Sequence, residues 1–242
     1  MRIVVISATS VIAKACLQNW AGSGKHEFVL VGRSQEKLEA TSNDLELRFP
    51  ESMFSSQVLD FASPESISKL ASEISQKPID IVLVAQGSLT NQALVEGNLA
   101  YLQAELELNA VSVAVVTEAF AEVLAQQGFG TLGVIGSVAG DRGRAYNYSY
   151  GASKALIETY TQGLQQRFGS SSVAVCLIKP GPTSSPMTVG HRGRMAEPKL
   201  VGKVIVAGLK AKRRTIYAPR KWAIIMFVVR AIPFAIFRNL KF

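Results

Sequence analysis

The sequence predicts an α/β fold: one doubly wound parallel sheet of about seven strands, with helices on both faces. Short apolar runs of strand length alternate with longer helix-like stretches along all 242 residues. Some runs, such as Ile81–Val84, are apolar throughout, which is typical of strands buried on both faces of a parallel sheet. The alternation indicates β-α-β units, and the length suits one domain, residues 1–242, with a sizeable core.

The expected elements follow one another in a regular order. Strands are expected at Arg2–Ile6, Glu27–Val31, Ser55–Leu59, Asp80–Val84, Gly130–Ile135, Ser172–Ile178 and Arg214–Tyr217. Helices are expected at Gln35–Phe49, Pro64–Gln76, Asn98–Gln127, 146–168 and Leu200–Ala211. The residues just after the strands include Ser7, Arg33, Asp60, Gly87, Ser137 and Pro180. Ligands bind beyond the carboxyl ends of strands in such sheets, so these residues should meet on one rim.

The composition excludes several classes of site. The two cysteines, Cys16 and Cys176, lie in expected core elements without the spacing of metal ligands, so free thiols in a reducing cytoplasm are expected. The chain has only two histidines, which argues against histidine-based catalysis, and no metal site is expected. An apolar strand directly follows Met1 and Arg2, which leaves no room for a signal peptide and favours a cytoplasmic location.

Tyr150 and Lys154 form the most informative pair in the chain. They are four residues apart within the expected helix 146–168, so their side chains share one face. A phenol titrates near pH ~10, and a neighbouring cation favours its ionised form, so Lys154 is expected to lower the pKa of Tyr150. Ser137, at a strand end, can donate a hydrogen bond to the same substrate oxygen. The three residues predict proton exchange with a carbonyl or alcohol oxygen; a packed tyrosine beside a surface lysine is the alternative for the pair alone.

These residues also carry a resemblance to a known family. Ser137, Tyr150 and Lys154 resemble the Ser, Tyr and Lys of the short-chain dehydrogenase/reductase family, and Lys179-Pro180-Gly181 stands where that family has its Pro-Gly loop. The likeness runs from Ile3 to about residue 187. It implies a Rossmann-type fold and NAD(P)-dependent hydride transfer between a carbonyl and an alcohol.

The resemblance also assigns roles to the catalytic residues. Tyr150 would exchange the proton with the substrate oxygen, and Ser137 would polarise the carbonyl. Lys154 would tune Tyr150 and hold the nicotinamide ribose. Asn109 would anchor a water that links Lys154 to solvent, although a helix-interior asparagine that only caps or bends its helix is the alternative.

A closer likeness concerns three segments. Gly136–Arg144, Ile178–Gly181 and Ala231–Arg238 resemble a subgroup that includes the decaprenylphosphoryl-2-keto-ribose reductases. This implies a lipid-linked keto-sugar as substrate, and the family often forms homodimers or homotetramers. Arg142 and Arg144 could grip a substrate phosphate, or they could be ordinary loop charges. Residues 184–198 are expected to form the substrate loop.

The expected cofactor turn, Ser7–Ala13, lacks the three glycines that the family usually has after its first strand. Ser7 must make a tight turn that glycine makes more easily. The hydroxyls of Ser7, Thr9 and Ser10, with N–H groups up to Ile12 at the helix start, can still bind a pyrophosphate. A degenerate turn that no longer binds a dinucleotide is the alternative.

Arg33 bears on the choice of cofactor. It stands where NAD-selective members have an acid, and its guanidinium suits the 2′-phosphate of NADP(H). NADP(H) is therefore favoured and NAD(H) remains possible, since Arg33 can also be an ordinary surface charge. By resemblance, the remaining cofactor-binding residues are Asp60, Phe61, Gly87, Lys154, Pro180, Gly181 and Ser185.

The carboxyl-terminal extension, residues 219–242, is basic and apolar. From Arg192 onward the chain has 13 Lys and Arg residues against the single acid Glu197. The apolar run Trp222–Val229 is much shorter than the ~20 residues of a spanning helix. Basic flanks around such a run favour an anionic membrane surface as partner. The alternative is packing over the substrate cleft or at a subunit interface. Nucleic acid is not an expected partner, because no nucleic-acid motif accompanies the charge.

Two hypotheses of function follow. The primary one is an NAD(P)-dependent oxidoreductase that reduces a carbonyl to an alcohol, or runs the reverse reaction, on a small-molecule or lipid-linked substrate. The second is a non-catalytic or partner-dependent Rossmann-fold protein that docks on a membrane or on another enzyme.

Overall fold

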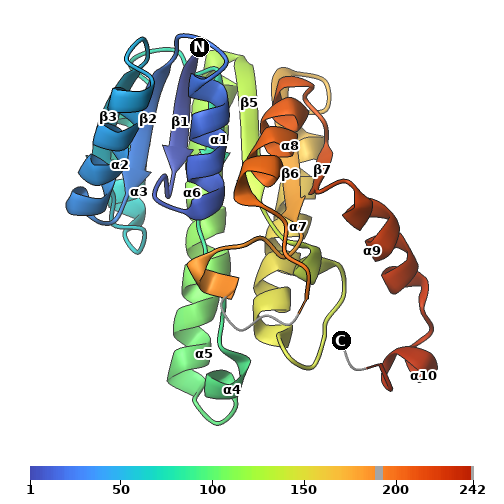
Figure 1. Ribbon diagram of the computed structural model, residues 1–242. Helices are drawn as coiled ribbons and strands as arrows, with labels where there is room; N and C mark the ends of the chain where they lie inside the picture. The colour runs from blue at the N-terminus through green and yellow to red at the C-terminus, as the bar shows by residue number, and fades with distance from the viewer. Residues whose placement is uncertain (189–192, 241–242) are drawn as a thin grey trace.

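The computed structural model describes residues 1–188 and 193–240, and its centre is a seven-stranded sheet (Figure 1). The strand order is β3-β2-β1-β4-β5-β6-β7, and every neighbouring pair is parallel. The strands are β1 Arg2–Ile6, β2 Glu27–Gly32, β3 Met53–Val58, β4 Ile81–Val84, β5 Phe129–Ile135, β6 Ser172–Pro180 and β7 Thr215–Ala218. The predicted fold class is confirmed, and all seven expected strands are present with small shifts at their ends.

Helices cover both faces of the sheet (Figure 1). On one face lie α1 Val11–Ala21, α2 Gln35–Arg48 and α8 Pro198–Lys210. On the other lie α3 Pro64–Ile74, α6 Ser112–Gln127 and α7 Tyr148–Arg167. The remaining helical segments are α4 Gln92–Val95, α5 Leu99–Leu106, the π-helical turn η1 Glu107–Val111, the short 3₁₀ turns η2 Val138–Asp141 and η3 Pro186–Thr188, α9 Lys221–Ala231 and α10 Phe234–Phe237.

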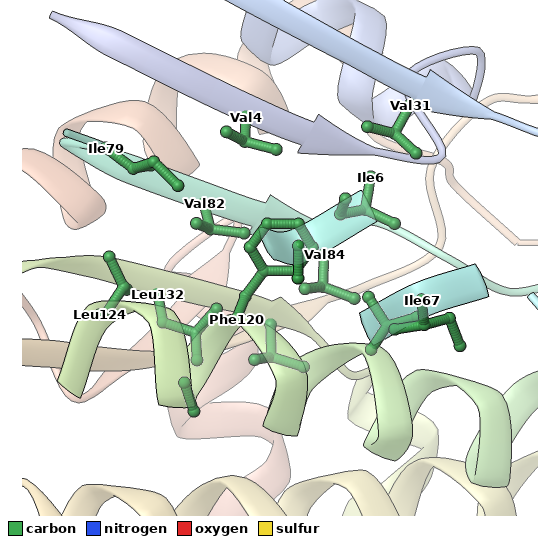
Figure 2. Close-up of a cluster of buried hydrophobic side chains, with 14 of the residues drawn as sticks. Val4, Ile6, Val31, Ile67, Ile79, Val82, Val84, Phe120, Leu124 and Leu132 are labelled. Atoms are coloured by element: carbon green, nitrogen blue, oxygen red, sulfur yellow. The ribbon is translucent and has the colours of Figure 1, made fainter. Parts of the chain in front are cut away.

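The core on each side of the sheet follows from the two-residue period of the strands. On β1, Val4 and Ile6 join the cluster under α6, whereas Ile3 and Val5 join the cluster under α1. Figure 2 shows Phe120 reaching from α6 towards Val82 and Val84 on β4. Successive residues of a strand point to opposite faces, and both faces are buried here. The strands are therefore continuous apolar runs in the sequence.

The helix expected at Asn98–Gln127 is interrupted. The structure divides it into α5, the π-helical turn η1 and α6. The stretch Leu99–Gln127 is the one helix among the described residues that is long and apolar enough to span a membrane. Its buried face, which includes Val113 and Phe120, packs against the sheet as part of the core.

The cysteines have the environment that the composition predicted. Cys16 and Cys176 are both buried free thiols. Burial raises the pKa of Cys176 to about 12 and raises that of Cys16 further above its ordinary value. Both thiols therefore stay protonated and behave as small apolar core groups.

A buried ion triad joins the segments around the carboxyl ends of β5 and β6. The ammonium of Lys179 on β6 lies 2.5 Å from Asp141 Oδ1 of η2 and 2.7 Å from Glu158 Oε2 of α7. The side chains of Lys179 and Asp141 are only 2% and 1% exposed. Burial acts to lower the pKa of Lys179, but the hydrogen bonds to the two carboxylates outweigh it and the pKa is raised. The lysine therefore stays charged and holds η2, α7 and β6 together.

Replacement of the cation should destabilise the fold strongly. Lys179→Met leaves Asp141 and Glu158 facing each other without a counter-ion, so we expect the free energy of unfolding to fall by about 3–5 kcal/mol. Denaturant titration measures this change. Arg167→Met is the matched control, because Arg167 pairs with Glu118 and Glu122 at the surface and its loss should change stability little. Equal, small effects of the two substitutions would show that the triad does not support the fold.

Candidate active site

A pocket of about 310 Å³ opens at the carboxyl ends of β1, β4, β5 and β6. The strand order reverses between β1 and β4, and a crevice at this position is where doubly wound sheets bind ligands. Nine of the predicted site residues line the pocket: Ser10, Ile12, Gly87, Ser137, Tyr150, Lys154, Pro180, Gly181 and Ser185. One predicted substrate residue, Arg144, lines it as well.

Ser137 and Tyr150 meet inside this pocket. Ser137 lies between β5 and η2, as the residue that caps η2. Its hydroxyl accepts a hydrogen bond of 3.1 Å from the backbone N–H of Ala139, which fixes the side chain at the start of η2. The phenol of Tyr150 on α7 lines the same pocket, and the Ser137 side chain acts to lower its pKa. The two hydroxyls therefore face one point, where a substrate oxygen can contact both.

The expected lowering of the Tyr150 pKa is not what the structure gives. Burial raises the pKa of the phenol, and the Ser137 side chain offsets only part of that rise. The ammonium of Lys154 lies 5.6 Å from the centre of the Tyr150 ring and is not among the causes of the shift. Helical spacing correctly predicts that Tyr150 and Lys154 share a face, but no local pattern of residues shows that the fold partly removes the phenol from water. Tyr150 is therefore a protonated acid at neutral pH.

Lys154 is buried behind Tyr150, with 3% of its surface exposed. Its ammonium faces the backbone carbonyls of Gln86 and Ile135, each at 3.5 Å, which is long for a hydrogen bond. Burial lowers the pKa of Lys154 to about 8. The residue is thus mostly charged at pH 7 and loses its charge in mildly alkaline solution.

Asn109 lies beneath the pocket, fully buried in the π-helical turn η1. Its Oδ1 accepts a hydrogen bond of 2.7 Å from the N–H of Ser88. At Gly87, which has φ +143°, a Cβ would lie 3.0 Å from both Asn109 Oδ1 and Lys154 Nζ, so the residue must be glycine. Asn109 thus holds the loop after β4 next to Lys154. The π-helical turn that carries Asn109 is a feature frequent at functional sites.

Glu105 is a site residue that the sequence reasoning missed. Its Oε2 accepts hydrogen bonds from Thr90 Oγ1 at 2.7 Å and from Asn109 Nδ2 at 3.1 Å. It therefore sets which way the Asn109 amide points. A carboxylate four residues before an asparagine on a helix was a usable signal, but the contact with Thr90 depends on how the β4 loop folds back.

The cofactor turn keeps its shape without glycine. Ser7 has φ 57°, the left-handed conformation that its position demands and that glycine adopts more easily. Ser10 caps α1 by accepting a hydrogen bond of 3.2 Å from the N–H of Ala13. Val11 and Ile12, in the first turn of α1, line the pocket, and the first N–H groups of a helix have no partner within it, so they are available to an anion. The pocket also contains Gln86 Oε1, a buried acceptor without a protein partner. These features fit a dinucleotide with its pyrophosphate at α1.

The remaining predicted cofactor residues lie outside this pocket. Ser7 and Thr9 belong to the turn at its edge, and Arg33, which is exposed, follows β2 on the far side of β1. Asp60 is exposed, and its Oδ1 accepts a hydrogen bond of 2.9 Å from the N–H of Ala62. Phe61 is only 6% exposed and packs in the core, so its side chain is unavailable to a ligand and only its backbone could contact one.

The Pro-Gly loop after β6 is covered by the carboxyl-terminal extension. A Cβ on Gly181 would lie 1.9 Å from Nε1 of Trp222, so the indole ring rests directly on this glycine. The following loop is closed at its base, where the N–H of Ser184 donates to Ala196 O at 2.9 Å. Part of the predicted substrate loop, 189–192, and residues 241–242 of the extension lie outside the described residues.

The two predicted substrate arginines have different positions. Arg144 lines the pocket beside the hydroxyl of Tyr146 and the sulfur of Met226, at 3.4 Å and 3.5 Å. Arg142 does not line it, because its guanidinium donates to backbone carbonyls at the end of α9. Only Arg144 is therefore placed to contact a ligand. The described residues contain no cluster of three or more His, Cys, Asp or Glu side chains that could hold a metal ion.

Comparison with known proteins identifies the family. A sequence model described as short chain dehydrogenase matches residues 1–195. The chain belongs to this family. It is a family of oxidoreductases, and the chain is 29% identical over 248 residues to an uncharacterized oxidoreductase of Streptomyces coelicolor, covering 98% of this chain and 95% of the relative.

Solved structures of short-chain dehydrogenases have the same fold. One from Burkholderia cenocepacia, in complex with NADP, superposes with a TM-score of 0.83 at 19% identity, covering 100% of this chain and 97% of the other. One from Sphingobium yanoikuyae, in complex with NADPH, gives a TM-score of 0.82 at 20% identity with the same coverage. At such low identity the likeness concerns the fold.

Lys154 should lower stability at neutral pH. Its pKa falls from 10.5 to about 8 on folding, so between these values the unfolded chain binds more protons and stability rises with pH. Lys154→Met removes this dependence and should raise the free energy of unfolding at pH 7 by on the order of 3 kcal/mol. The gain should shrink towards pH ~10. Denaturant titrations across this pH range measure it.

Lys69→Met, at an exposed lysine of α3, is the control and should show no such trend. A gain from Lys154→Met that is the same at neutral and alkaline pH would contradict a buried, titrating ammonium.

Proposed function

We propose that this protein is an NADP(H)-dependent reductase that converts a carbonyl group into an alcohol. The observation that carries the proposal is that Ser137, Tyr150 and Lys154 line one pocket, in which the Lys154 ammonium lies 5.6 Å from the centre of the Tyr150 ring. Membership of a family of oxidoreductases supports it independently.

Tyr150, Ser137 and Lys154 have different roles in the transfer of the proton. NADP(H), when bound, supplies the hydride. Tyr150 gives its phenolic proton to the carbonyl oxygen, while Ser137 donates a hydrogen bond to the same atom. The phenolate left on Tyr150 is stabilised by the Lys154 ammonium until a proton from solvent replaces the lost one. Because burial raises the pKa of Tyr150, the phenol is protonated at neutral pH, which suits the reductive direction.

Three features support the choice of cofactor. Arg33 follows β2 with no acid beside it, and it is exposed and available for a 2′-phosphate. The start of α1 and Ser10 suit a pyrophosphate. Solved relatives of the same fold hold NADP or NADPH. NAD(H) remains the second choice, since the position of Arg33 is also compatible with a solvated charge.

The lining of the pocket suggests the class of substrate. Arg144 is a cation in the lining, which suits an anionic substituent such as a phosphate. Met226 of α9 lies next to it, and the extension that carries Met226 is rich in apolar residues. A keto-sugar linked to a lipid through phosphate, as in the decaprenylphosphoryl-2-keto-ribose reductases, has both features. We propose this substrate class, with a cytoplasmic enzyme that assembles as a homodimer or homotetramer.

The second candidate is a protein that binds no dinucleotide and does no chemistry. The glycine-poor turn Ser7–Ala13 is the feature that favours it, because a left-handed Ser7 is strained. The assembled Ser137, Tyr150 and Lys154 count against it. A fluorescence titration with NADPH separates the two candidates, since saturable binding is expected only of the reductase.

Removal of the Tyr150 hydroxyl should abolish reduction. Tyr150→Phe keeps the ring but removes the acid, so we expect kcat to fall by about 100-fold or more while NADPH still binds. NADPH oxidation with a panel of ketones and keto-sugars measures turnover. Tyr148→Phe is the matched control, because this phenol lies two residues away on α7 and outside the pocket. Unchanged turnover in Tyr150→Phe would remove Tyr150 from catalysis.

Arg33 should determine the preference between cofactors. NADPH should bind more tightly than NADH, and Arg33→Ala should remove most of the difference by weakening only NADPH. Titrations with both cofactors measure this. Arg48→Ala, an exposed arginine at the other end of α2, should leave both affinities unchanged. Equal affinities of the unmodified protein for the two cofactors would refute the assignment.

A further inference from the structure

The carboxyl-terminal helices form an arm at one edge of the molecule (Figure 1). We define the arm as residues 221–238, which contain α9, α10 and their connection. Its inner side packs on β7 and η2, and the side chain of Met226 is fully buried there. Its outer side carries five large apolar side chains that are more than half exposed: Ile224 73%, Phe227 75%, Val228 55%, Phe234 72% and Ile236 56%.

The exposed apolar residues of α9 share one face. Ile224, Phe227 and Val228 have the spacing i, i+3 and i+4, so their side chains lie side by side on the helix. A folded protein rarely leaves such a group in water unless something binds it. The face is therefore an interaction surface that the described residues leave uncovered.

The charge around this face is of one sign. Arg220 directly precedes the arm, Lys221 begins it, Arg230 and Arg238 lie farther along it, and all four are exposed. Residues 198–240 contain no acidic side chain. An apolar face flanked only by cations matches the interface of an anionic bilayer, where apolar side chains enter the acyl boundary and cations meet phosphates.

The arm is held in place from the catalytic side. Arg142 Nη1 donates to the carbonyls of Val229 and Ile232, each at 2.6 Å, and the guanidinium lies 3.7 Å from the centre of the Phe237 ring. A cation at the end of a helix compensates its last carbonyls and its dipole. Trp222 fixes the other end on Gly181. The outer face is therefore presented by an anchored element and need not be ordered by its partner.

We propose that the outer face of the arm docks the protein on an anionic lipid surface. A second copy of this chain is a poorer occupant, because a two-fold interface sets the same patch against itself and would bring these cations together. The docking goes beyond the proposed reaction and does not depend on it, since no arm residue is catalytic. It would bring the pocket residue Arg144, which contacts Met226 of the arm, close to the bilayer.

Vesicle co-sedimentation tests the proposal. The full chain should bind vesicles of equal parts phosphatidylglycerol and phosphatidylcholine, and should not bind phosphatidylcholine alone. Binding should weaken by about tenfold or more between roughly 0.05 M and 0.5 M salt, because ions screen the arginine–phosphate attraction. Ile224→Ser with Phe227→Ser should reduce binding by at least about tenfold, since both side chains would enter the acyl boundary. Arg230→Glu with Arg238→Glu should abolish binding to the anionic vesicles.

Matched controls lie on α2. Leu47 is 85% exposed and Lys37 is also exposed, so Leu47→Ser and Lys37→Glu remove an apolar side chain and reverse a positive charge away from the arm and should leave binding unchanged. The substituted arm residues are exposed, so thermal melts of all variants should match that of the parent. Truncation before Trp222 is a poorer test, because it also removes the contact with Gly181.

Three outcomes would overturn the proposal. The parent could bind neither kind of vesicle. The double serine variant could bind as the parent does. The double serine variant could also convert an oligomer into monomers in sedimentation while vesicle binding stays unchanged, which would identify a second copy as the occupant. If the parent protein bound anionic vesicles but did not oxidise NADPH with any substrate tested, that result would contradict the proposed reaction and leave the docking proposal standing.

Discussion

The buried ammonium of Lys179 is the interaction on which the geometry of the site depends. Lys179 is the penultimate residue of β6, directly before Pro180, and its partners Asp141 and Glu158 come from the segments that carry Ser137 and Lys154. Such a triad contributes little net stability compared with apolar packing, because each ion loses its water. Its effect is positional: the strong directional contacts allow one arrangement of η2, α7 and β6, and that arrangement brings the serine and the phenol together.

Burial, more than charge pairing, determines the chemistry of the pocket. It raises the pKa of Tyr150 and lowers that of Lys154 to about 8. The same dry environment strengthens each remaining electrostatic contact. The site therefore combines a proton donor, the Tyr150 phenol, with a nearby lysine ammonium that loses its charge in mildly alkaline solution. Its neutral phenol is ready to give a proton, and the ammonium becomes important once a phenolate forms.

Two side chains, Arg142 and Trp222, connect the arm to the segments around the pocket. Arg142 was a candidate either for contact with a substrate phosphate or for an ordinary loop charge, and its guanidinium instead donates to the carbonyls at the end of α9. Trp222 was expected within an apolar run, yet its ring rests on the Pro-Gly loop. Both open alternatives for the extension are therefore compatible with the structure, because one side of the arm packs beside the cleft while the other faces outward.

The sequence by itself determined the sheet, because apolar periodicity is a local property, and the shared face of Tyr150 and Lys154, because helical spacing fixes it. It also indicated that Ser7 needs an unusual conformation, which its φ of 57° confirms. Tertiary structure alone decided the pKa of Tyr150, the role of Glu105, the core position of Phe61 and the partners of Arg142. Each of these depends on which distant segments exclude water or supply a partner, and no local pattern of residues contains that information.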